Sequence, residues 1–371
     1  MKKRSLLLSS MTIVSLAISL VGCKNNEYKI TGSIEGLSNG EQVTIMRRGS
    51  NFNMDTLGVS IVEKGKFAFS GKQDTTSIWT LVYNINGTTK TPLIFVEPGN
   101  IKVEINREKE TILGSPSNDA YQELRTELKF VEDFREQLIE KMREGKLQEG
   151  SEEYYNGTQK FAEMSKKADG KAFEVAKKNA KNEVGALLFG SFSEKFTAAQ
   201  REELAELLSE ENKKKEHVVP ALKRMLAEKN TKEGNKFVDL EMKSPEGEVV
   251  KLSDLVSQNK LVVVDFWASW CGPCRAATPE LINIYNEYKD KGVQFVGISL
   301  DTSLDEWKES IAELSIPWIQ MSDLRGWSSA GAEEYVVRGV PHLMVISQDG
   351  TILKRGINKD ELKEFLKETF K

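Results

Sequence analysis

Near the end of the chain, a short apolar run leads through one loop into a helical pattern, and this order most constrains the fold. The run consists of Leu261, Val262, Val263 and Val264. A continuous apolar run of this length is typical of a strand that is covered on both faces of a sheet. Strand and helix patterns alternate from Phe237 onward. This alternation predicts an α/β domain in the C-terminal part of the chain.

Two cysteines, Cys271 and Cys274, stand where this strand pattern ends and the helix pattern begins. Free N–H groups and the dipole at a helix N-terminus favour a thiolate over a thiol, so we predict that Cys271 is the reactive sulfur. Cys274 lies one helical turn further along, where it can displace a mixed disulfide formed on Cys271. Pro273 fixes φ in the first helical turn. The spacing therefore predicts a redox pair in which Cys274 is the resolving thiol, more buried and less acidic than Cys271.

Two other uses of this cysteine pair remain open. The whole chain holds only 3 cysteines and 2 histidines. A zinc site would need about two further ligands, and neither Cys23 nor His217 is expected nearby, so we predict no metal. A purely structural disulfide would close so small a loop that it would constrain the unfolded chain little.

The positions of two further residues, an aspartate and a proline, suggest a role at the cysteine pair. Asp265 lies six residues before Cys271, inside the apolar run. Burial there would raise its pKa and let it exchange a proton near neutral pH, whereas a solvated carboxylate at the strand end is the alternative. Pro341 precedes the apolar residues 343–346. A proline that enters a strand suggests a cis peptide bond or a sheet edge, and an ordinary loop proline is the alternative.

The cysteine stretch resembles a known family. Residues 263–274 look like the active-site stretch of thioredoxin, and residues 236–371 resemble the TlpA/ResA-like thioredoxins. The likeness rests on Trp270-Cys271-Gly272-Pro273-Cys274, on Pro279, and on Val337-Arg338-Gly339-Val340-Pro341. It implies a thioredoxin fold and a thiol-disulfide oxidoreductase that uses no cofactor. In such an enzyme Cys271 attacks, Cys274 resolves, and Asp265 is the buried acid that assists Cys274.

The resemblance also implies a substrate groove and brings two departures from the family pattern. The groove would be shaped by Trp270, Gly272, Pro273, Val340 and cis Pro341, with Trp270 packed beside the site. Many membrane-tethered relatives have a glutamate where this chain has Ala277, which puts a dedicated role in reducing apocytochrome c in doubt. His342 replaces the more common threonine or serine, and it is either a packed histidine or a group that tunes the thiolate.

The N-terminus has the pattern of a signal peptide, residues 1–22. Basic residues 2–4 precede an apolar run over residues 6–21, whose length is marginal for a retained transmembrane helix. Residues 20–23 resemble a bacterial lipobox, which implies cleavage before Cys23 and acylation of that cysteine; a signal peptide with an incidental cysteine is the alternative. Multiple acyl chains would hold the protein to a membrane in the cell envelope, outside the cytoplasm.

Two further regions precede the α/β part. Over residues 27–116, apolar residues alternate with polar ones between turn signals, which predicts an all-β, sandwich-like domain. In Asp55-Thr56, Gly65-Lys66-Phe67, Val96-Glu97-Pro98-Gly99 and Gly114-Ser115, this segment resembles an uncharacterised β-domain that often precedes thioredoxin domains in bacterial lipoproteins. Residues 117–232 are rich in charge with apolar residues at steps of three and four, which predicts helices with solvated faces, or alternatively a partner-binding surface. Residues 228–236 have the composition of a linker.

Together these features predict a multidomain, membrane-tethered thiol-disulfide oxidoreductase. The Gly-Pro dipeptide between the cysteines resembles reducing members of the family, so the implied partners are oxidised exported proteins and a transmembrane thiol electron donor. The 52 basic and 56 acidic side chains leave no footprint for nucleic acid. One alternative is a peroxiredoxin-like thiol peroxidase, although Val264 and Ala268 stand where its motif needs proline and threonine. Another is a client-binding or chaperone lipoprotein with a secondary redox site.

Overall fold

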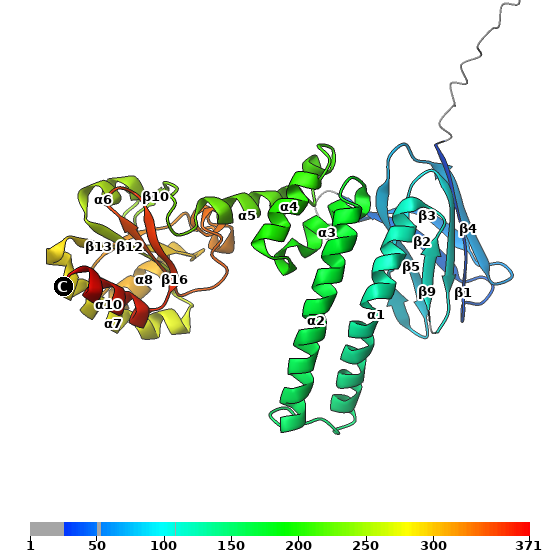
Figure 1. The fold of residues 1–371 in the computed structure, drawn as a ribbon, viewed down its shortest axis with the longest axis horizontal. Helices are drawn as coiled ribbons and strands as arrows, with labels where there is room; N and C mark the ends of the chain where they lie inside the picture. The colour runs from blue at the N-terminus through cyan, green and yellow to red at the C-terminus, as the bar shows by residue number, and fades with distance from the viewer. Residues whose placement is uncertain (1–25, 50–52, 108) are drawn as a thin grey trace, which may run out of the picture. The chain divides into compact units, whose positions relative to one another are not determined.

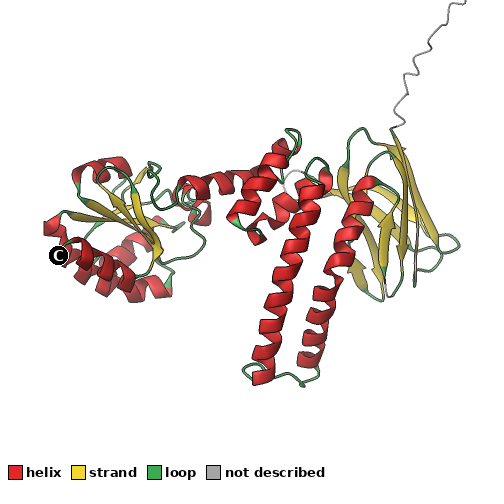
Figure 2. Ribbon diagram, viewed as in Figure 1, coloured by secondary structure: helices red, strands yellow, loops and turns green. Residues whose placement is uncertain are grey.

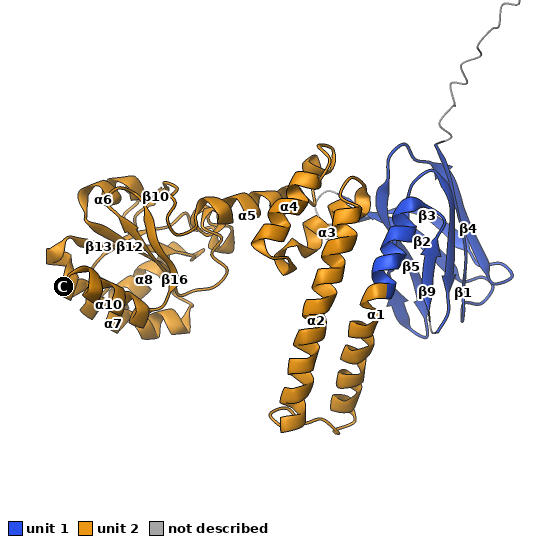
Figure 3. Cartoon of the chain, viewed as in Figure 1, with its two compact units in different colours: residues 1–126 blue, residues 127–371 orange. Residues whose placement is uncertain are grey.

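The computed structural model describes residues 26–49, 53–107 and 109–371. The predicted signal peptide and the predicted acylation site at Cys23 lie outside these ranges. In the part of the chain that the structure describes, no helix is both long enough and apolar enough to cross a membrane. The chain forms two compact units, residues 1–126 and 127–371 (Figure 3). Because this division does not separate the helical region from the α/β region, the three predicted domain boundaries stay predictions.

The first unit contains two β-sheets that share one apolar core. One sheet has the strand order β4-β1-β8-β9, and the other has the order β3-β2-β5-β6 with β7 also paired to β5. The alternation in the sequence turns Tyr28 and Ile30 of β1 toward this core. The N-terminal all-β prediction is therefore confirmed. The strands are β1 (Glu27–Ile34), β2 (Gln42–Arg48), β3 (Met54–Ile61), β4 (Lys66–Lys72), β5 (Ser77–Ile85), β6 (Thr88–Lys90), β7 (Leu93–Val96), β8 (Gly99–Ile105) and β9 (Glu110–Leu113).

Helices occupy the middle of the chain, as the sequence predicts (Figure 2). Side-chain caps begin several of them: Ser151 accepts from the N–H of Tyr154, and Asn182 accepts from the N–H of Val184. Apolar side chains such as Phe189 are fully buried between these helices. The helices are α1 (Pro116–Arg143), α2 (Glu152–Lys178), α3 (Glu183–Phe192), α4 (Ala198–Leu207) and α5 (Val219–Asn230), with short 3-10 turns η2 (Ser193–Lys195) and η3 (Asn212–Lys214).

The C-terminal region is a five-stranded sheet with helices on both faces. Its strand order is β14-β13-β12-β15-β16, in which β12 runs parallel to β13 and antiparallel to β15. The strands are β12 (Leu261–Trp267), β13 (Val293–Ser299), β14 (Ile319–Met321), β15 (His342–Ser347) and β16 (Ile352–Ile357), preceded by the hairpin β10 (Glu241–Lys243) and β11 (Val249–Lys251). The helices are α6 (Leu252–Gln258), α7 (Gly272–Tyr288), α8 (Leu304–Leu314), α9 (Ala330–Glu334) and α10 (Lys359–Thr369), with the 3-10 turns η4 (Lys289–Lys291) and η5 (Gly326–Ser328).

The central strand β12 is buried at all seven positions. On one face Val263 packs in a cluster with residues of α7 and α10, which lie side by side in Figure 1. On the other face Val264 packs in a cluster with residues of α6, α8 and α9. The apolar run of the sequence is therefore a strand covered on both faces, and the predicted α/β fold is confirmed.

The segment predicted as a linker, residues 228–236, is attached to the sheet instead. The N–H of Gly234 donates to the carbonyl of Ile352 at 2.8 Å, and the N–H of Ile352 donates to the carbonyl of Asn235 at 2.8 Å. The ammonium of Lys236 donates to the carboxylate of Asp349 at 2.9 Å. Polar composition suggests a free segment, but here the polar backbone and side chains bond along β16. Residues 127–371, which include this segment, form one compact unit.

Candidate redox site

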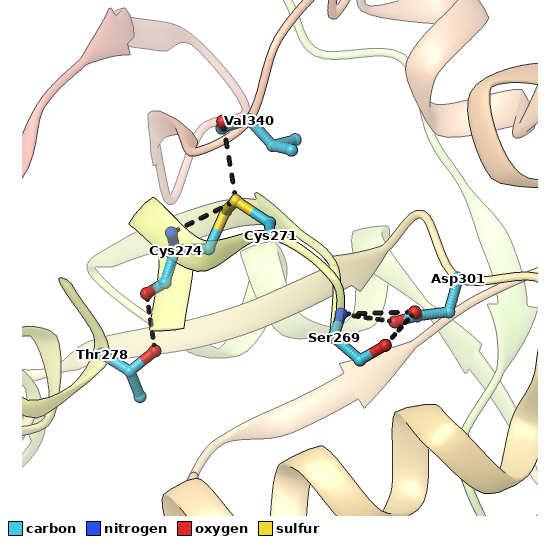
Figure 4. Close-up of a disulfide and its surroundings, with 6 residues drawn as sticks. All are labelled: Ser269, Cys271, Cys274, Thr278, Asp301 and Val340. Carbon is cyan, nitrogen blue, oxygen red and sulfur yellow. Dashed lines mark hydrogen bonds between the residues drawn. A yellow bond between two sulfur atoms is a disulfide. The ribbon is translucent and has the colours of Figure 1, made fainter. Parts of the chain in front are cut away.

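The cysteine pair lies at the junction of β12 and α7, as the sequence predicts. β12 ends at Trp267, and α7 begins at Gly272 with Cys271 as its N-cap residue. The N–H of Cys274 points at the sulfur of Cys271, at an N···Sγ distance of 3.2 Å (Figure 4). A helix N-terminus with an N–H directed at sulfur favours negative charge there. This geometry makes Cys271 the sulfur better suited to be a thiolate.

Cys271 and Cys274 form a disulfide in this structure, with their Cα atoms 5.3 Å apart. The structure is thus the oxidised form of the pair. Both residues are buried, with 4% of Cys271 and 3% of Cys274 exposed. The expected difference in burial between attacking and resolving thiol is therefore not visible in the oxidised form. In the same turn, the hydroxyl of Thr278 donates to the carbonyl of Cys274 at 3.0 Å.

A second segment reaches the pair from far along the chain. The peptide bond between Val340 and Pro341 is cis. The carbonyl oxygen of Val340 lies 3.7 Å from the sulfur of Cys271 (Figure 4). The next residue, His342, begins β15 and pairs with Phe266 of β12. This strand pairing holds the proline loop beside the sulfur of Cys271.

Asp265 is a buried acid in the centre of the sheet. Only 5% of the residue is exposed, and its Oδ1 atom has no hydrogen-bond partner. Loss of hydration raises the pKa of this carboxyl to about 7. The alternative of a solvated carboxylate at the strand end is therefore wrong. A carboxyl with a pKa near 7 can accept or release a proton at neutral pH.

His342 is a packed histidine. Burial lowers the pKa of its imidazole to about 4, and the positive charge of Arg355 acts in the same direction. Its Nε2 atom is buried without a partner, and its ring makes a T-shaped contact with the ring of Phe266 at a centroid distance of 5.8 Å. At neutral pH the imidazole is uncharged. It therefore supplies no positive charge that could stabilise a thiolate.

The predicted groove residues surround the cysteine pair at the surface. Gly272, Pro273 and Pro341 are exposed, and Val340 is partly buried. Trp270 lies beside the site with its ring against that of Trp327, although 54% of the residue is exposed. Access to the sulfur of Cys271 is therefore bounded by exposed side chains on the helix start and on the proline loop.

Sequence reasoning missed two residues that support or border the site. Asp301 is fully buried, and it accepts hydrogen bonds from the N–H of Ser269 at 3.0 Å and from its hydroxyl at 2.6 Å (Figure 4). It thereby fixes the loop that leads to Cys271. Its signal in the sequence is weak, an acid shortly after an apolar strand. The second residue is Trp327, whose ring contacts that of Trp270 at a centroid distance of 6.1 Å.

Comparisons with known proteins agree with this geometry. Residues 259–352 match a family described as thioredoxin-like, and residues 28–121 match a domain of unknown function, DUF4369. The protein named thiol-disulfide oxidoreductase ResA from Oceanobacillus iheyensis is 44% identical over 72 residues, which is 18% of this chain and 36% of that protein. A protein of the same name from Bacillus thuringiensis is 29% identical over 139 residues, covering 37% of this chain and 76% of that protein.

A solved structure described as a thiol-disulfide oxidoreductase from Bacteroides fragilis is 33% identical to this chain. The alignment covers 38% of this chain and all of that one, with a TM-score of 0.34. The chain spans only about a third of the first curated relative that it matches, 36% of its length. The thioredoxin-like match over residues 259–352 contains the cysteine pair and the proline loop.

Proposed function

We propose that this protein reduces disulfide bonds of exported proteins. Along the chain, a DUF4369 domain is followed by a thioredoxin-like domain of the thiol-disulfide oxidoreductase type. One observation supports this most directly. The sulfur of Cys271 sits at the start of α7, with the N–H of Cys274 directed at it and the carbonyl of Val340 beside it. The N–H and the helix dipole stabilise a thiolate, and the exposed Pro273 and Pro341 leave its surroundings open to a protein substrate.

Reduction proceeds in two exchange steps. The Cys271 thiolate attacks one sulfur of a client disulfide, so that the client S–S bond breaks, a mixed disulfide forms and the other client sulfur leaves as a thiolate. The Cys274 thiol then loses its proton and attacks the Cys271 sulfur, which releases the second client thiolate. The client gains two electrons, and the protein ends with the Cys271–Cys274 disulfide.

Asp265 accepts the proton of Cys274 in the second step, directly or through one water. The pKa of this carboxyl, raised to about 7 by burial, suits that role, because a large fraction is ionised at neutral pH. Its Oδ1 atom has no hydrogen-bond partner in the protein, so the atom is available to a proton donor.

The test of this function is a mixed-disulfide trap in cells. The Cys274→Ser variant should accumulate client proteins bound covalently through Cys271, because the second step is blocked. The matched Cys271→Ser variant should accumulate none, although it retains Cys274. Equal trapping by both variants would mean that our assignment of the attack to Cys271 alone is wrong. If neither variant traps a client and the wild type reduces no model disulfide, the proposed function is wrong.

The direction of exchange depends on the reduction potential. A reductant should have a potential near the roughly -270 mV of thioredoxin, and a value near the roughly -120 mV of the oxidant DsbA would reverse our proposal. Each turnover leaves the pair oxidised, so a transmembrane thiol donor must return two electrons to it. Equilibration with glutathione buffers, followed by counting of free thiols, measures the potential.

Tethering rests on residues 20–23, the sequence that resembles a lipobox. We propose that Cys23 is acylated and holds the protein to a membrane of the cell envelope, outside the cytoplasm. The wild type should then sediment with membranes and enter the detergent phase on phase separation. Cys23→Ser should lose both properties, whereas Cys274→Ser should keep them. A Cys23→Ser protein that remains in the membrane fraction would exclude the lipid anchor.

A further inference from the structure

The six tryptophans of the chain fall into two groups. Four of them are buried, with at most 6% of each residue exposed: Trp79, Trp267, Trp307 and Trp318. The other two, Trp270 and Trp327, are 54% and 48% exposed, and their rings touch with centroids 6.1 Å apart and planes at 52°. Trp270 directly precedes Cys271. The two exposed indoles therefore form one aromatic pair beside the reactive sulfur, and exposed apolar groups gathered at one place mark an interaction site.

The end of β13 fixes both loops that present these rings. The Asp301 carboxylate accepts from Ser269, the neighbour of Trp270, and also from the hydroxyl of Ser299 at 2.6 Å. The hydroxyl of Ser322 donates to the carbonyl of Ser299 at 2.9 Å, at the start of the loop that bears Trp327. Asp301, Ser299 and Ser322 are all buried. This buried network keeps the two loops in a fixed relation before any substrate arrives.

The loop around Trp327 is also held in an uncommon backbone conformation. Leu324 and Gly326 have positive φ angles of 57° and 59°. Positive φ costs energy at a leucine, and such conformations persist where surrounding bonds enforce them. Here the carboxylate of Asp323 accepts from the N–H of Ala330 at 2.8 Å, which closes the loop. Trp327, which is 48% exposed, lies within this closed loop.

We propose that Trp270 and Trp327 form one subsite for a large apolar side chain that lies next to the disulfide cysteine of an extended client segment. The inference rests on the proposed reductase function. A client cysteine bonded to Cys271 brings its own sequence neighbours to Trp270, the residue beside that sulfur. Tryptophan supplies a large, rigid contact area, and it is enriched among the residues that dominate binding energy. Because the buried network fixes both loops in advance and the two rings already contact each other, little ordering of the backbone opposes binding.

The test compares disulfide substrates in single-turnover reduction by the reduced full chain. Three peptide disulfides differ only in the residue next to cysteine, which is Phe, Gly or Arg, and oxidised glutathione is the fourth substrate. In the wild type the Phe peptide should react fastest. Trp327→Ala should slow the Phe peptide by about tenfold, as expected for loss of a dominant contact, and change the Gly peptide and glutathione less than twofold. Trp327→Phe should restore most of the lost rate.

Tyr155→Ala is the matched control, because it removes an aromatic ring that is 58% exposed on α2. It should change no rate. Equal slowing of all four substrates by Trp327→Ala would overturn the inference, since the residue would then only shape the cysteine pair. A Phe peptide rate that Trp327→Ala leaves unchanged would overturn it as well. If the wild type reacts fastest with the Arg peptide, the two rings bind a cation and not an apolar side chain, and the inference is wrong. If the wild type reduces none of the four disulfides, the proposed function itself is wrong.

Discussion

The central strands of the two sheet-bearing regions, β1 and β12, bury their residues differently. β1 is buried at alternate positions along its first half and keeps Lys29 exposed, because its sheet has one face on the core. β12 is buried at every position, because helices cover both faces of its sheet. Both strands lie between two neighbours, so the difference comes from what covers the sheets.

This difference determines where reactive groups can arise. In the N-terminal region a carboxylate such as Glu104 of β8 occupies an outward position and stays hydrated. In β12 an acid has no outward face available, so Asp265 is desolvated and its pKa rises to about 7. A sheet covered on both faces can therefore turn an ordinary acid into a proton carrier for neutral pH. A sheet with one solvated face keeps its outward acids in contact with water.

The largest effect on activity that we expect from this contrast concerns the release of the client. Asp265→Asn should slow the release of client from the mixed disulfide by roughly 100-fold at pH 8, because the base for Cys274 is lost. In the wild type the same step should accelerate as pH rises through about 7, where the carboxyl ionises, and then become level. Rapid mixing of a preformed mixed disulfide with detection of peptide release measures this step.

The matched control for this kinetic prediction is Glu104→Gln, a change of an outward acid in the other sheet. It should leave both the rate and the pH profile unchanged. If the rate of client release in Asp265→Asn keeps its inflection near pH 7, Asp265 is not the group that accepts the proton. The contrast between the two sheets would then concern stability alone.

The next effect concerns stability against pH. The pKa of Asp265 rises from 3.8 to about 7 on folding, so between these values the folded state holds a proton that the unfolded state has released. The free energy of unfolding should consequently fall by about 4 kcal/mol from pH 4 to pH 7 through this group. Asp265→Asn should remove that fall. Urea unfolding followed by tryptophan fluorescence reports this unit, which contains all the tryptophans except Trp79.

His342 should produce the opposite slope. Its pKa falls from 6.5 to about 4 on folding, so the unfolded state holds the extra proton between these values. The free energy of unfolding should rise by about 3 kcal/mol from pH 4 to pH 6.5 through this group. The wild type should show a shallow profile, Asp265→Asn a rising one and His342→Leu a falling one. Parallel profiles in all three proteins would mean that neither group is desolvated as described.

The smallest effect compares single valines. Val264→Ala in β12, at a fully buried position, should lower the free energy of unfolding by about 2 kcal/mol through the cavity it leaves. Val59→Ala in β3, at a residue that is 52% exposed, should change it by less than about 0.5 kcal/mol. Val43→Ala, at a buried position in β2, separates two causes of the difference, burial of the side chain and the region of the chain. If it lowers the free energy of unfolding as much as Val264→Ala, burial is the cause. If it lowers it as little as Val59→Ala, the cause is the region in which the valine lies. Urea midpoints of each unit measure all three.

Local patterns were sufficient for much of the fold and the site. Residues 261–264 predicted a strand covered on both faces, and the following cysteines predicted a strand-to-helix junction. Both predictions depend on neighbours within a few residues, so the sequence contains all the information they need. The linker prediction was wrong for the opposite reason. Residues 228–236 have a polar composition, but their partners in β16 lie more than a hundred residues further along the chain.

By itself, the sequence determined which residues could do redox chemistry, because a helix start, an apolar run and a two-residue spacing are local properties. The family resemblance placed Val340 and Pro341 at the groove, but only the tertiary structure decided which atoms contact those residues. It brought the carbonyl of Val340 to the sulfur of Cys271, and it placed Trp327 against Trp270. These contacts join segments more than fifty residues apart, and strand pairing and the buried network around Asp301 fix them. No pattern within one segment specifies which distant segment will pack against it.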